Sequence, residues 1–341
     1  MKLQDIIEQH WYHKSNLLLT LFLFPFSLVY GLIIHARKLL FNLKLKPQSN
    51  VGVPVVIIGN ISVGGAGKTP LTKAIATELI ARGIKVGIVL RGYKSNSHGE
   101  LIVSAKDSSI LVGDEALIYA QAGFRVAIGS KRVAAAKLLI EKYPDIQLIL
   151  ADDGMQHYYL QRDMEICVVD SSRMFGNQQL LPLGPLREPM RRLKKVSAIV
   201  VNGHANQNKL ASILAKYAVP VYYQELEFIH FYNPQTQQIA TVQEMKNKHL
   251  MAIAAIGNPA RFFNYLKNLG LELSKQQSFP DHYHYLKSDI NPQYAIITTE
   301  KDYTKLAQFN AANIWVTMVT AKLDNCQLIE QIVHLTQKEY N

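Results

Sequence analysis

The clearest pattern in the chain lies between Val55 and Leu71, where an apolar run meets a glycine-rich stretch, VVIIGNISVGGAGKTPL. The β-branched run from Val55 to Ile58 does not alternate between apolar and polar positions, so it predicts a parallel strand buried on both faces. Apolar residues recur at helical spacing from Leu71 to Ile80 and predict a helix, and Gly83 lies where the residue after a helix end is expected. The pattern therefore predicts a strand, a glycine-rich loop and a helix in direct succession.

The loop between this strand and helix has the composition of a phosphate-binding loop. Its glycines let successive backbone N–H groups turn toward a polyphosphate, Lys68 adds a positive charge near the β- and γ-phosphates, and Thr69 offers a hydroxyl to Mg²⁺. The phosphates would also meet the N-terminus of the helix. The general pattern has glycine five positions before Gly67, where this chain has Ser62; a glycine-rich turn that binds nothing is the alternative. The residues predicted to bind nucleotide are Ser62, Val63, Gly64, Gly65, Ala66, Gly67, Lys68 and Thr69.

The N-terminal segment has two further apolar patterns. In residues 1–14 the apolar side chains fall on one face of a short amphipathic helix. Leu17 to Ile34 spans 18 residues without a charge and is apolar on every side. At about 1.5 Å per residue such a helix reaches about 27 Å, slightly less than a hydrocarbon core of about 30 Å, and Pro25 lies near its centre. We expect this segment to contact a membrane, either spanning it or embedded in one leaflet, with a buried core helix as the alternative.

From Val51 onward strands and helices alternate, which is typical of an α/β fold built on a parallel sheet. We expect a P-loop NTPase-like parallel sheet core at residues 47–218, after an N-terminal membrane-associated segment at residues 1–46. Besides the strand before the loop, the predicted core strands are Ile84–Leu90, Gln147–Ala151, Glu165–Asp170 and Ala198–Asn202.

The rest of the chain predicts a second, smaller α/β lobe. Residues 219–246 read as two strands joined by the turn at Asn233-Pro234, which predicts a β-hairpin linker. Residues 247–341 then predict further strand and helix units, including a helix capped by Asn258 with Pro259 at its first position, and a terminal helix after Asp324.

Acidic residues lie at the ends of two predicted elements in the core. Asp152 and Asp153 come directly after the strand Gln147–Ala151. An acidic residue at the carboxyl end of a strand, downstream of a phosphate loop, is the usual second ligand of Mg²⁺, although an aspartate there can also only cap a turn. Asp114 and Glu115 lie in the cap and first turn of another predicted helix, in the string VGDEALIYA.

Composition narrows the expected partners. The chain of 341 residues carries a net charge of +11, which favours polyanions such as nucleic acid, acidic lipid or a phosphorylated substrate. Cys167 and Cys326 are too few and too far apart for a disulfide framework or a zinc site, so we expect a reducing, cytosolic environment. A basic run after the proline-rich segment is either solvated surface or a contact for anionic substrate or lipid. Its residues are Arg187, Arg191, Arg192, Lys194 and Lys195.

Several strings together resemble the tetraacyldisaccharide 4′-kinase family, the lipid A pathway kinases of Gram-negative bacteria. They are GNISVGGAGKTP, LRGY, VGDEA, DDGMQH, FGNQQLLPLGPLREP, IGNPARFF, FPDHYHY and TTEKD, which run in the family's order from Gly59 to Asp302. The loop of that family resembles SVGGxGKT, which accounts for Ser62. The resemblance implies a kinase that transfers the γ-phosphate of ATP to the 4′-hydroxyl of a tetraacylated glucosamine disaccharide 1-phosphate, forming lipid IVA. It also implies Mg²⁺ as cofactor.

The resemblance also implies roles for residues near the nucleotide. Lys68 and Thr69 would hold the phosphates and Mg²⁺, and Arg187 would lie near the phosphates. The remaining metal-placing residues would be Asp152, Asp153 and Glu188.

For the acceptor side, the resemblance implies that Asp114 acts with His282 to activate the sugar hydroxyl. The chain has Tyr283 where the family usually shows a second histidine, and Met174 and Gln178 where glycines are common. A second histidine is therefore not expected to contribute, while the implied role of His282 is unaffected.

Other classes of protein fit less well. A membrane-surface ATPase switch of the partitioning type resembles KGGxGKT, but Val63 occupies the lysine position here. A GTP-binding switch would need an Asn-Lys-x-Asp or Thr-Lys-x-Asp string, whereas Lys301 directly precedes Asp302. A nucleic-acid motor fits the charge but has no place for the apolar N-terminal segment. We therefore expect a monomer that acts on a lipid A precursor and inner-membrane lipid, binds no nucleic acid, and has its active site on the cytoplasmic face of a bacterial inner membrane.

Overall fold

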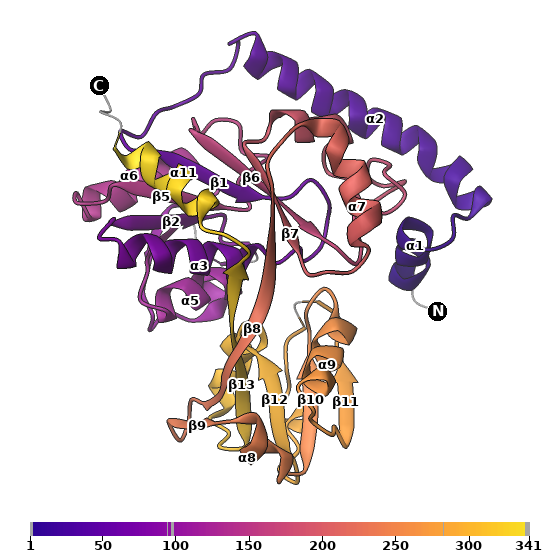
Figure 1. Ribbon diagram of the computed structural model, residues 1–341, viewed down its shortest axis with the longest axis vertical. Coiled ribbons are helices and arrows are strands. Elements are labelled where there is room, and N and C mark those ends of the chain that lie inside the picture. The colour runs from indigo at the N-terminus through magenta and orange to yellow at the C-terminus, as the bar shows by residue number, and fades with distance from the viewer. Residues whose placement is uncertain (1–2, 94, 97–98, 282, 338–341) are drawn as a thin grey trace.

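Figure 1 shows the computed structural model of the chain, which describes residues 3–93, 95–96, 99–281 and 283–337. In these residues one sheet of 13 strands passes through a larger and a smaller lobe. The strands lie in the order β11 (Lys275–Ser278), β10 (Leu250–Ala254), β12 (Ala295–Thr299), β13 (Ile314–Leu323), β8 (Val221–Asn233), β7 (Ala198–Asn202), β6 (Met164–Asp170), β1 (Val55–Gly59), β5 (Leu148–Asp152), β2 (Val86–Leu90), β4 (Arg125–Ile128) and β3 (Leu101–Val103), and β9 (Gln238–Ala240) pairs with β8.

The larger lobe is a parallel sheet with β1 at its centre, between β5 and β6. Every residue of β1, β2, β5, β6 and β7 is buried, because helices cover both faces. One face carries α3 (Lys68–Ala81) and α5 (Asp114–Gln121), and the other carries α6 (Arg132–Lys142) and α7 (Gln207–Leu214). This arrangement confirms the predicted parallel core. The prediction missed β4, which pairs in parallel with β2, and β3, a short antiparallel strand at the sheet edge.

The smaller lobe repeats the α/β arrangement, with β11, β10, β12 and β13 parallel to one another. Its α9 (Pro259–Asn268) begins as predicted, since the Asn258 side chain accepts a hydrogen bond from the backbone N–H of Arg261 and Pro259 is the first helical residue. The polar edge strand β11 was not predicted.

The remaining elements of the two lobes are α4 (Ser109–Val112), α8 (Val242–Lys246), α10 (Glu300–Leu306), η1 (Met190–Lys195), η2 (Ala215–Tyr217), η3 (Lys287–Asp289) and η4 (Ala307–Phe309).

Two long strands connect the lobes. β8 continues the larger sheet by pairing in parallel with β7, and its far end pairs with β9 in the predicted hairpin. Along most of its length β8 also pairs antiparallel with β13, which the sequence did not indicate. The connection is therefore a ribbon of two strands in which β13 carries the chain back to the larger lobe.

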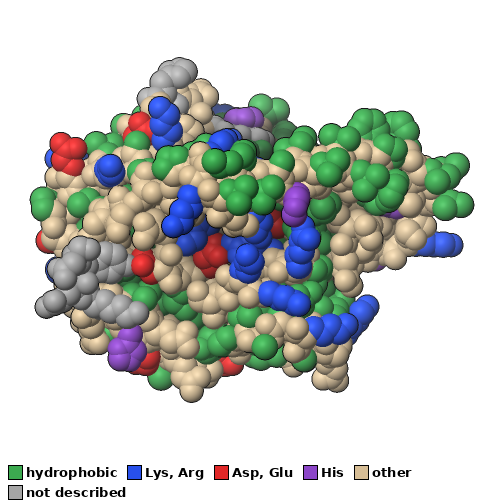
Figure 2. All heavy atoms as spheres, turned by 90° about the horizontal axis from the view of Figure 1, so that it is seen from above, with side chains coloured by type: hydrophobic (Ala, Val, Ile, Leu, Met, Phe, Trp, Pro, Cys, Tyr) green, Lys and Arg blue, Asp and Glu red, His purple; other side chains and the backbone are tan. Residues whose placement is uncertain are grey.

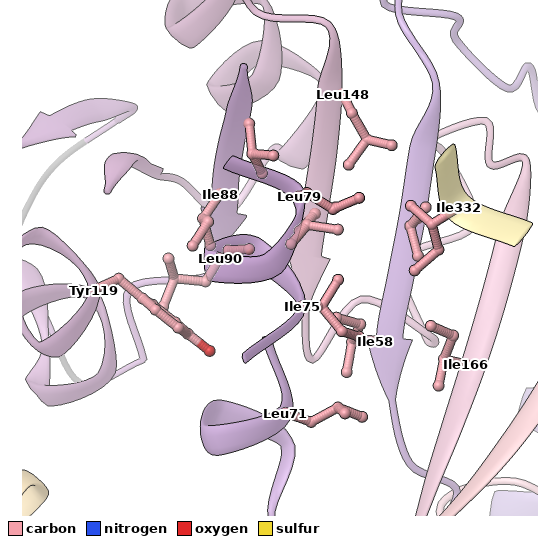
Figure 3. Packing of buried hydrophobic residues seen from close by; sticks show 14 of the residues in the cluster. Ile58, Leu71, Ile75, Leu79, Ile88, Leu90, Tyr119, Leu148, Ile166 and Ile332 are labelled. Atoms are coloured by element: carbon pink, nitrogen blue, oxygen red, sulfur yellow. The ribbon is translucent and has the colours of Figure 1, made fainter. Parts of the chain in front are cut away.

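The C-terminal helix α11 (Gln327–Thr336) differs from its predicted place. It was expected to close the smaller lobe, but Leu328, Ile329 and Ile332 are buried in the same cluster as Leu71 and other residues of α3. Figure 3 shows Ile332 beside the strands of the larger lobe. The division of the chain at residues 46, 218 and 246 stays a prediction. Within that division α11 belongs to residues 247–341, although its apolar residues pack in the core of the larger lobe.

The N-terminal helices lie against the larger lobe (Figure 1). The first helix, α1 (Leu3–Tyr12), is tied down by Trp11, whose indole N–H donates to the carbonyl of Pro182 at 3.0 Å. The second, α2 (Leu17–Asn42), has 26 residues and continues through Pro25 beyond the predicted end at Ile34. It is the one helix of the described chain that is long and apolar enough to cross a membrane, judged by length and composition.

We predict that Ile332→Ala destabilises the larger lobe by about 2–4 kcal/mol, because the truncation leaves a cavity in a filled core. Ile332 is fully buried, whereas His334 on the same helix is exposed. Thermal melting in detergent should therefore show a clearly lower midpoint for Ile332→Ala and an unchanged one for His334→Ala. Equal midpoints for both variants would contradict the assignment of α11 to this core.

Candidate active site

The glycine-rich loop joins β1 to α3 at the carboxyl edge of the larger sheet, as predicted. Gly67 has φ = 89°, and a Cβ atom there would overlap the side-chain amide of Asn202, so only glycine fits. The Asn202 amide donates to the carbonyl of Ala66 at 2.9 Å, and the Gln224 amide donates to that of Gly67 at 3.1 Å. Side chains from the ends of β7 and from β8 therefore fix the loop through its carbonyl groups.

The opposite side of the loop is open. Gly64 and Gly65 are exposed, and within the described residues their backbone N–H groups have no hydrogen-bond acceptor. Exposed N–H donors beside a helix N-terminus form a binding site for anions. The geometry of the loop thus suits a polyphosphate.

The Asp153 carboxylate contacts two cations, Lys68 of the glycine-rich loop and Arg187. It follows β5 with φ = 49°, and its Oδ1 lies 3.2 Å from Lys68 Nζ. The Arg187 guanidinium also contacts this carboxylate, with Nη1 at 3.1 Å from Oδ2. Burial opposes ionisation, but Lys68 and Arg187 together hold the pKa of Asp153 well below its usual range. The structure therefore brings together Lys68, Asp153 and Arg187, which lie far apart in the sequence.

Asp152 has the opposite electrostatic environment. It is fully buried at the end of β5, and its Oδ2 accepts a hydrogen bond from the Tyr119 hydroxyl at 2.6 Å. Burial and the nearby negative charge of Glu115 raise the pKa of Asp152. A divalent cation close by would favour the ionised form of both aspartates.

The groups available to a metal here are oxygen atoms. No group of three His, Cys, Asp or Glu side chains that could hold a metal ion occurs in the described part of the chain. Mg²⁺ typically binds one or two carboxylates and completes its shell with phosphate oxygens and water. The carboxylates of Asp152 and Asp153 at the end of β5, with the Thr69 hydroxyl in the first turn of α3, are oxygen donors of that kind.

Glu188, also expected near the metal, accepts hydrogen bonds from three protein side chains. Its Oε1 accepts from the Gln156 amide at 2.8 Å, and its Oε2 accepts from the Tyr158 hydroxyl at 2.6 Å and from Arg192 Nε at 3.1 Å. The side chain is buried between η1 and the loop after β5. This geometry gives Glu188 a structural role in joining the two segments, and its metal role stays a prediction.

Asp114 is the first residue of α5 and faces the smaller lobe. Its Oδ2 lies 3.0 Å from Nζ of Lys305, and its Oδ1 lies 3.4 Å from the Thr304 hydroxyl, both on α10. His282 lies outside the described residues, so the expected pair of Asp114 and His282 stays a prediction. Sequence reasoning did not single out Lys305, although it lies three residues after the TTEKD string.

The smaller lobe also reaches the glycine-rich loop. A Cβ atom on Gly257, in the segment after β10, would lie 3.5 Å from the backbone nitrogen of Gly65. Arg261 at the start of α9 contacts Asp170 at 3.2 Å and donates to the Asn202 side chain at 3.1 Å. The candidate site is therefore lined by both lobes. The string IGNPARFF contains Arg261, but the sequence predicted no role for this residue, because its partners belong to distant strands.

Basic and apolar side chains share one side of the molecule. Figure 2 shows Lys and Arg side chains gathered next to the hydrophobic surface of the N-terminal region. Arg191 of η1 contacts the His35 ring at 3.1 Å, and burial together with neighbouring Arg192 lowers the pKa of Lys38. Part of the predicted basic run therefore lies against the second half of α2.

Comparisons with known proteins agree over nearly the whole chain. A family model described as tetraacyldisaccharide-1-P 4′-kinase matches residues 19–337. The tetraacyldisaccharide 4′-kinase of Chromobacterium violaceum is 41% identical over 95% of this chain and 96% of its own length. That of Methylobacillus flagellatus is 36% identical over 98% and 97%. The crystal structure of LpxK from Aquifex aeolicus in complex with ATP is similar with a TM-score of 0.78, 29% identity, and coverage of 92% and 98% of the two chains.

We predict that Gly67→Ala lowers the thermal melting midpoint by several degrees, because the new Cβ atom would collide with Asn202 at a positive φ. Gly65→Ala is the matched control, since a Cβ atom there meets nothing within 4 Å. Differential scanning fluorimetry without nucleotide compares the two variants. A Gly67→Ala protein as stable as Gly65→Ala would show that the loop is not held as described.

Proposed function

The chain belongs to the tetraacyldisaccharide-1-P 4′-kinase family, and we propose that the site between its lobes carries out the reaction of that family. The protein transfers the γ-phosphate of ATP to the 4′-hydroxyl of a tetraacylated glucosamine disaccharide 1-phosphate, the lipid A precursor. The observation that carries this proposal is the cluster of Lys68, Asp153 and Arg187 beside the glycine-rich loop. Phosphoryl transfer depends mainly on positioning and charge neutralisation, which such a cluster supplies.

On the donor side, the open N–H groups of the glycine-rich loop would hold the phosphates of ATP. Lys68 and Arg187 would move from Asp153 to phosphate oxygens when the nucleotide binds. Thr69, Asp152 and Asp153 would hold Mg²⁺. When bound, Mg²⁺ neutralises negative charge on the β- and γ-phosphates.

On the acceptor side, Asp114 would accept the proton of the sugar hydroxyl, with His282 as its partner. The position of Asp114 in the first turn of α5, facing α10 of the smaller lobe, supports this role. A carboxylate with an ordinary pKa near 3.9 is a weak base toward a hydroxyl, so it needs partners that orient it. Closure of the smaller lobe over the loop would also exclude water from the phosphoryl group.

The main alternative, an ATPase switch of the partitioning type, is not favoured. Val63 occupies the position of the first lysine in the KGGxGKT string of that class, and the family match covers most of the chain. We also propose that the protein acts as a monomer on lipid and does not use its basic surface for nucleic acid, because that surface lies against the apolar helix α2.

We predict that Lys68→Ala and Thr69→Ala each lower kcat/KM by at least about 10²-fold, since both residues contact the phosphates or the metal. The assay measures phosphate transfer from ATP to the tetraacylated disaccharide 1-phosphate in detergent micelles at saturating Mg²⁺. Lys85→Ala and Thr77→Ala are matched controls, because both side chains are exposed and lie away from the loop. Thr77 is in the second half of α3, and Lys85 directly precedes β2. Near-native turnover in either loop variant would refute the assignment of the loop.

The contacts of α2 with the larger lobe limit the length of this helix that could enter a membrane. From Ser27 to Phe41 one side of the helix lies against the larger lobe. The Ser27 hydroxyl donates a hydrogen bond to the Leu180 carbonyl, and the Phe41 ring packs on the ring of Tyr159. Only the first ten residues of α2, about 15 Å of helix, precede these contacts. That length is half of a hydrocarbon core of about 30 Å.

We therefore propose that α2 is embedded in one leaflet of the inner membrane and that the active site lies on its cytoplasmic face. The exposed apolar side chains of α2 would enter the lipid, and the adjacent basic residues would lie at the headgroups. These exposed side chains are Leu17, Leu18, Leu21, Phe22, Phe24, Phe26, Leu28, Val29, Leu32, Ile33 and Leu39.

We predict that the double variant Leu18→Glu/Phe22→Glu is released from anionic phospholipid vesicles in a flotation assay, because charges at these positions would enter hydrocarbon. The control variant Ile239→Glu/Leu286→Glu changes equally exposed apolar residues of the smaller lobe and should float with the vesicles. Complete flotation of the α2 variant in high salt would show that another surface anchors the protein.

A further inference from the structure

Lys305 contacts Asp114 through an ion pair between the lobes. Its Nζ lies 3.0 Å from Asp114 Oδ2, and the two side chains are 8% and 10% exposed. The residues are 191 positions apart, on α10 of the smaller lobe and α5 of the larger one. Because the pair is so well covered, solvent screens it less than the ion pairs on the surface.

The helix that carries Lys305 is anchored at several points. The Thr299 side chain caps its start by accepting from the backbone N–H of Asp302, and buried Asp302 accepts from the backbone N–H of Ala255 at 3.1 Å. Glu300 in the first turn contacts Lys73 of α3 at 2.7 Å. The ammonium group of Lys305 is therefore held by a helix that is fixed to the smaller lobe and to the helix after the nucleotide loop.

A carboxylate can act as a base only in its ionised form and in a fixed orientation. Removal from water disfavours ionisation, and an opposite charge within about 4 Å favours it. The other titratable groups that line the small cavity next to Asp114 are Glu115 and Tyr93. Neither carries a positive charge, whereas the ammonium group of Lys305 lies directly against the Asp114 carboxylate.

We propose that Lys305 is the positioning residue for Asp114: its buried ammonium group, supplied by the smaller lobe, orients the carboxylate and keeps it ionised for the acceptor hydroxyl. This inference rests on the proposed role of Asp114 as the base. It gives α10 a direct part in catalysis, because the base is correctly placed only when the smaller lobe presents Lys305 to it.

The test compares the full-length variants Lys305→Met, Lys305→Gln and Lys305→Arg with the wild-type protein in the micellar transfer assay. Both neutral variants should lower kcat at neutral pH by about tenfold or more and leave KM for ATP within about twofold. The acidic limb of the pH profile of kcat/KM should move upward by about one pH unit, because losing the ammonium group raises the pKa of Asp114. Lys305→Arg keeps the charge and should keep the limb in place.

Two controls distinguish a specific effect on Asp114 from a general loss of positive charge. Lys322→Met removes an exposed lysine that pairs with Glu227 on the connecting ribbon, and it should leave both kcat and the pH profile unchanged. Adding Lys305→Met to Asp114→Asn should lower kcat no further, since residues that act as one unit are not additive. Circular dichroism melts check that each variant is folded.

The outcomes are distinguishable. If Asp114→Asn keeps wild-type kcat, the proposed base is wrong and the inference fails with it. If Asp114→Asn is inactive while the acidic limb of a folded neutral Lys305 variant stays in place, only the role of Lys305 is overturned. If the neutral variants do not fold, Lys305→Arg decides, because a shifted limb in a variant that keeps the charge would contradict the proposal.

Discussion

The site depends on one carboxylate, that of Asp153, which two cations share. Asp153 follows β5, the strand next to β1, in a left-handed backbone conformation, and its oxygens contact both Lys68 and Arg187. Without an anion between them, these two positive charges would repel each other at short range. Asp153 therefore holds the cations in place while no phosphate is bound, and its own ionised state depends on them in turn.

The topology of the sheet brings the other residues of the site close to Asp153. Parallel strands end at a common edge, so the loop after β1, the acidic turn after β5 and the side chain of Asn202 after β7 converge although the sequence separates them. The ribbon of β8 and β13 then positions the smaller lobe over the loop, where Arg261 reaches Asn202. The helix α2 lies along the larger lobe through contacts such as that of the Ser27 hydroxyl with the Leu180 carbonyl. In the proposed function, this helix would bring that edge of the sheet to the membrane surface.

The sequence predicted features whose signal is local and missed those that depend on distant contacts. The strand, loop and helix around Lys68 follow from neighbouring residues, as does the acidic pair after β5. The return of α11 to the larger lobe could not be read from its amphipathic pattern, because either lobe could cover its apolar face. The contact of Lys305 with Asp114 was hidden for a similar reason, since spacing along the chain carries no information about which helices of two lobes meet. The extension of α2 past Ile34 into charged residues is explained by contacts to the larger lobe, such as that of Arg37 with the Gln156 carbonyl.

The central claim is that Asp153 holds Lys68 and Arg187 ready for the phosphates of ATP. A crystal structure of the protein with Mg²⁺ and a non-hydrolysable ATP analogue tests it most directly. We predict that Lys68 Nζ and the Arg187 guanidinium leave Asp153 for phosphate oxygens, and that the Asp153 carboxylate turns to the metal or its bound water. A nucleotide bound in the loop while Lys68 stays 3.2 Å from Asp153 would contradict the account.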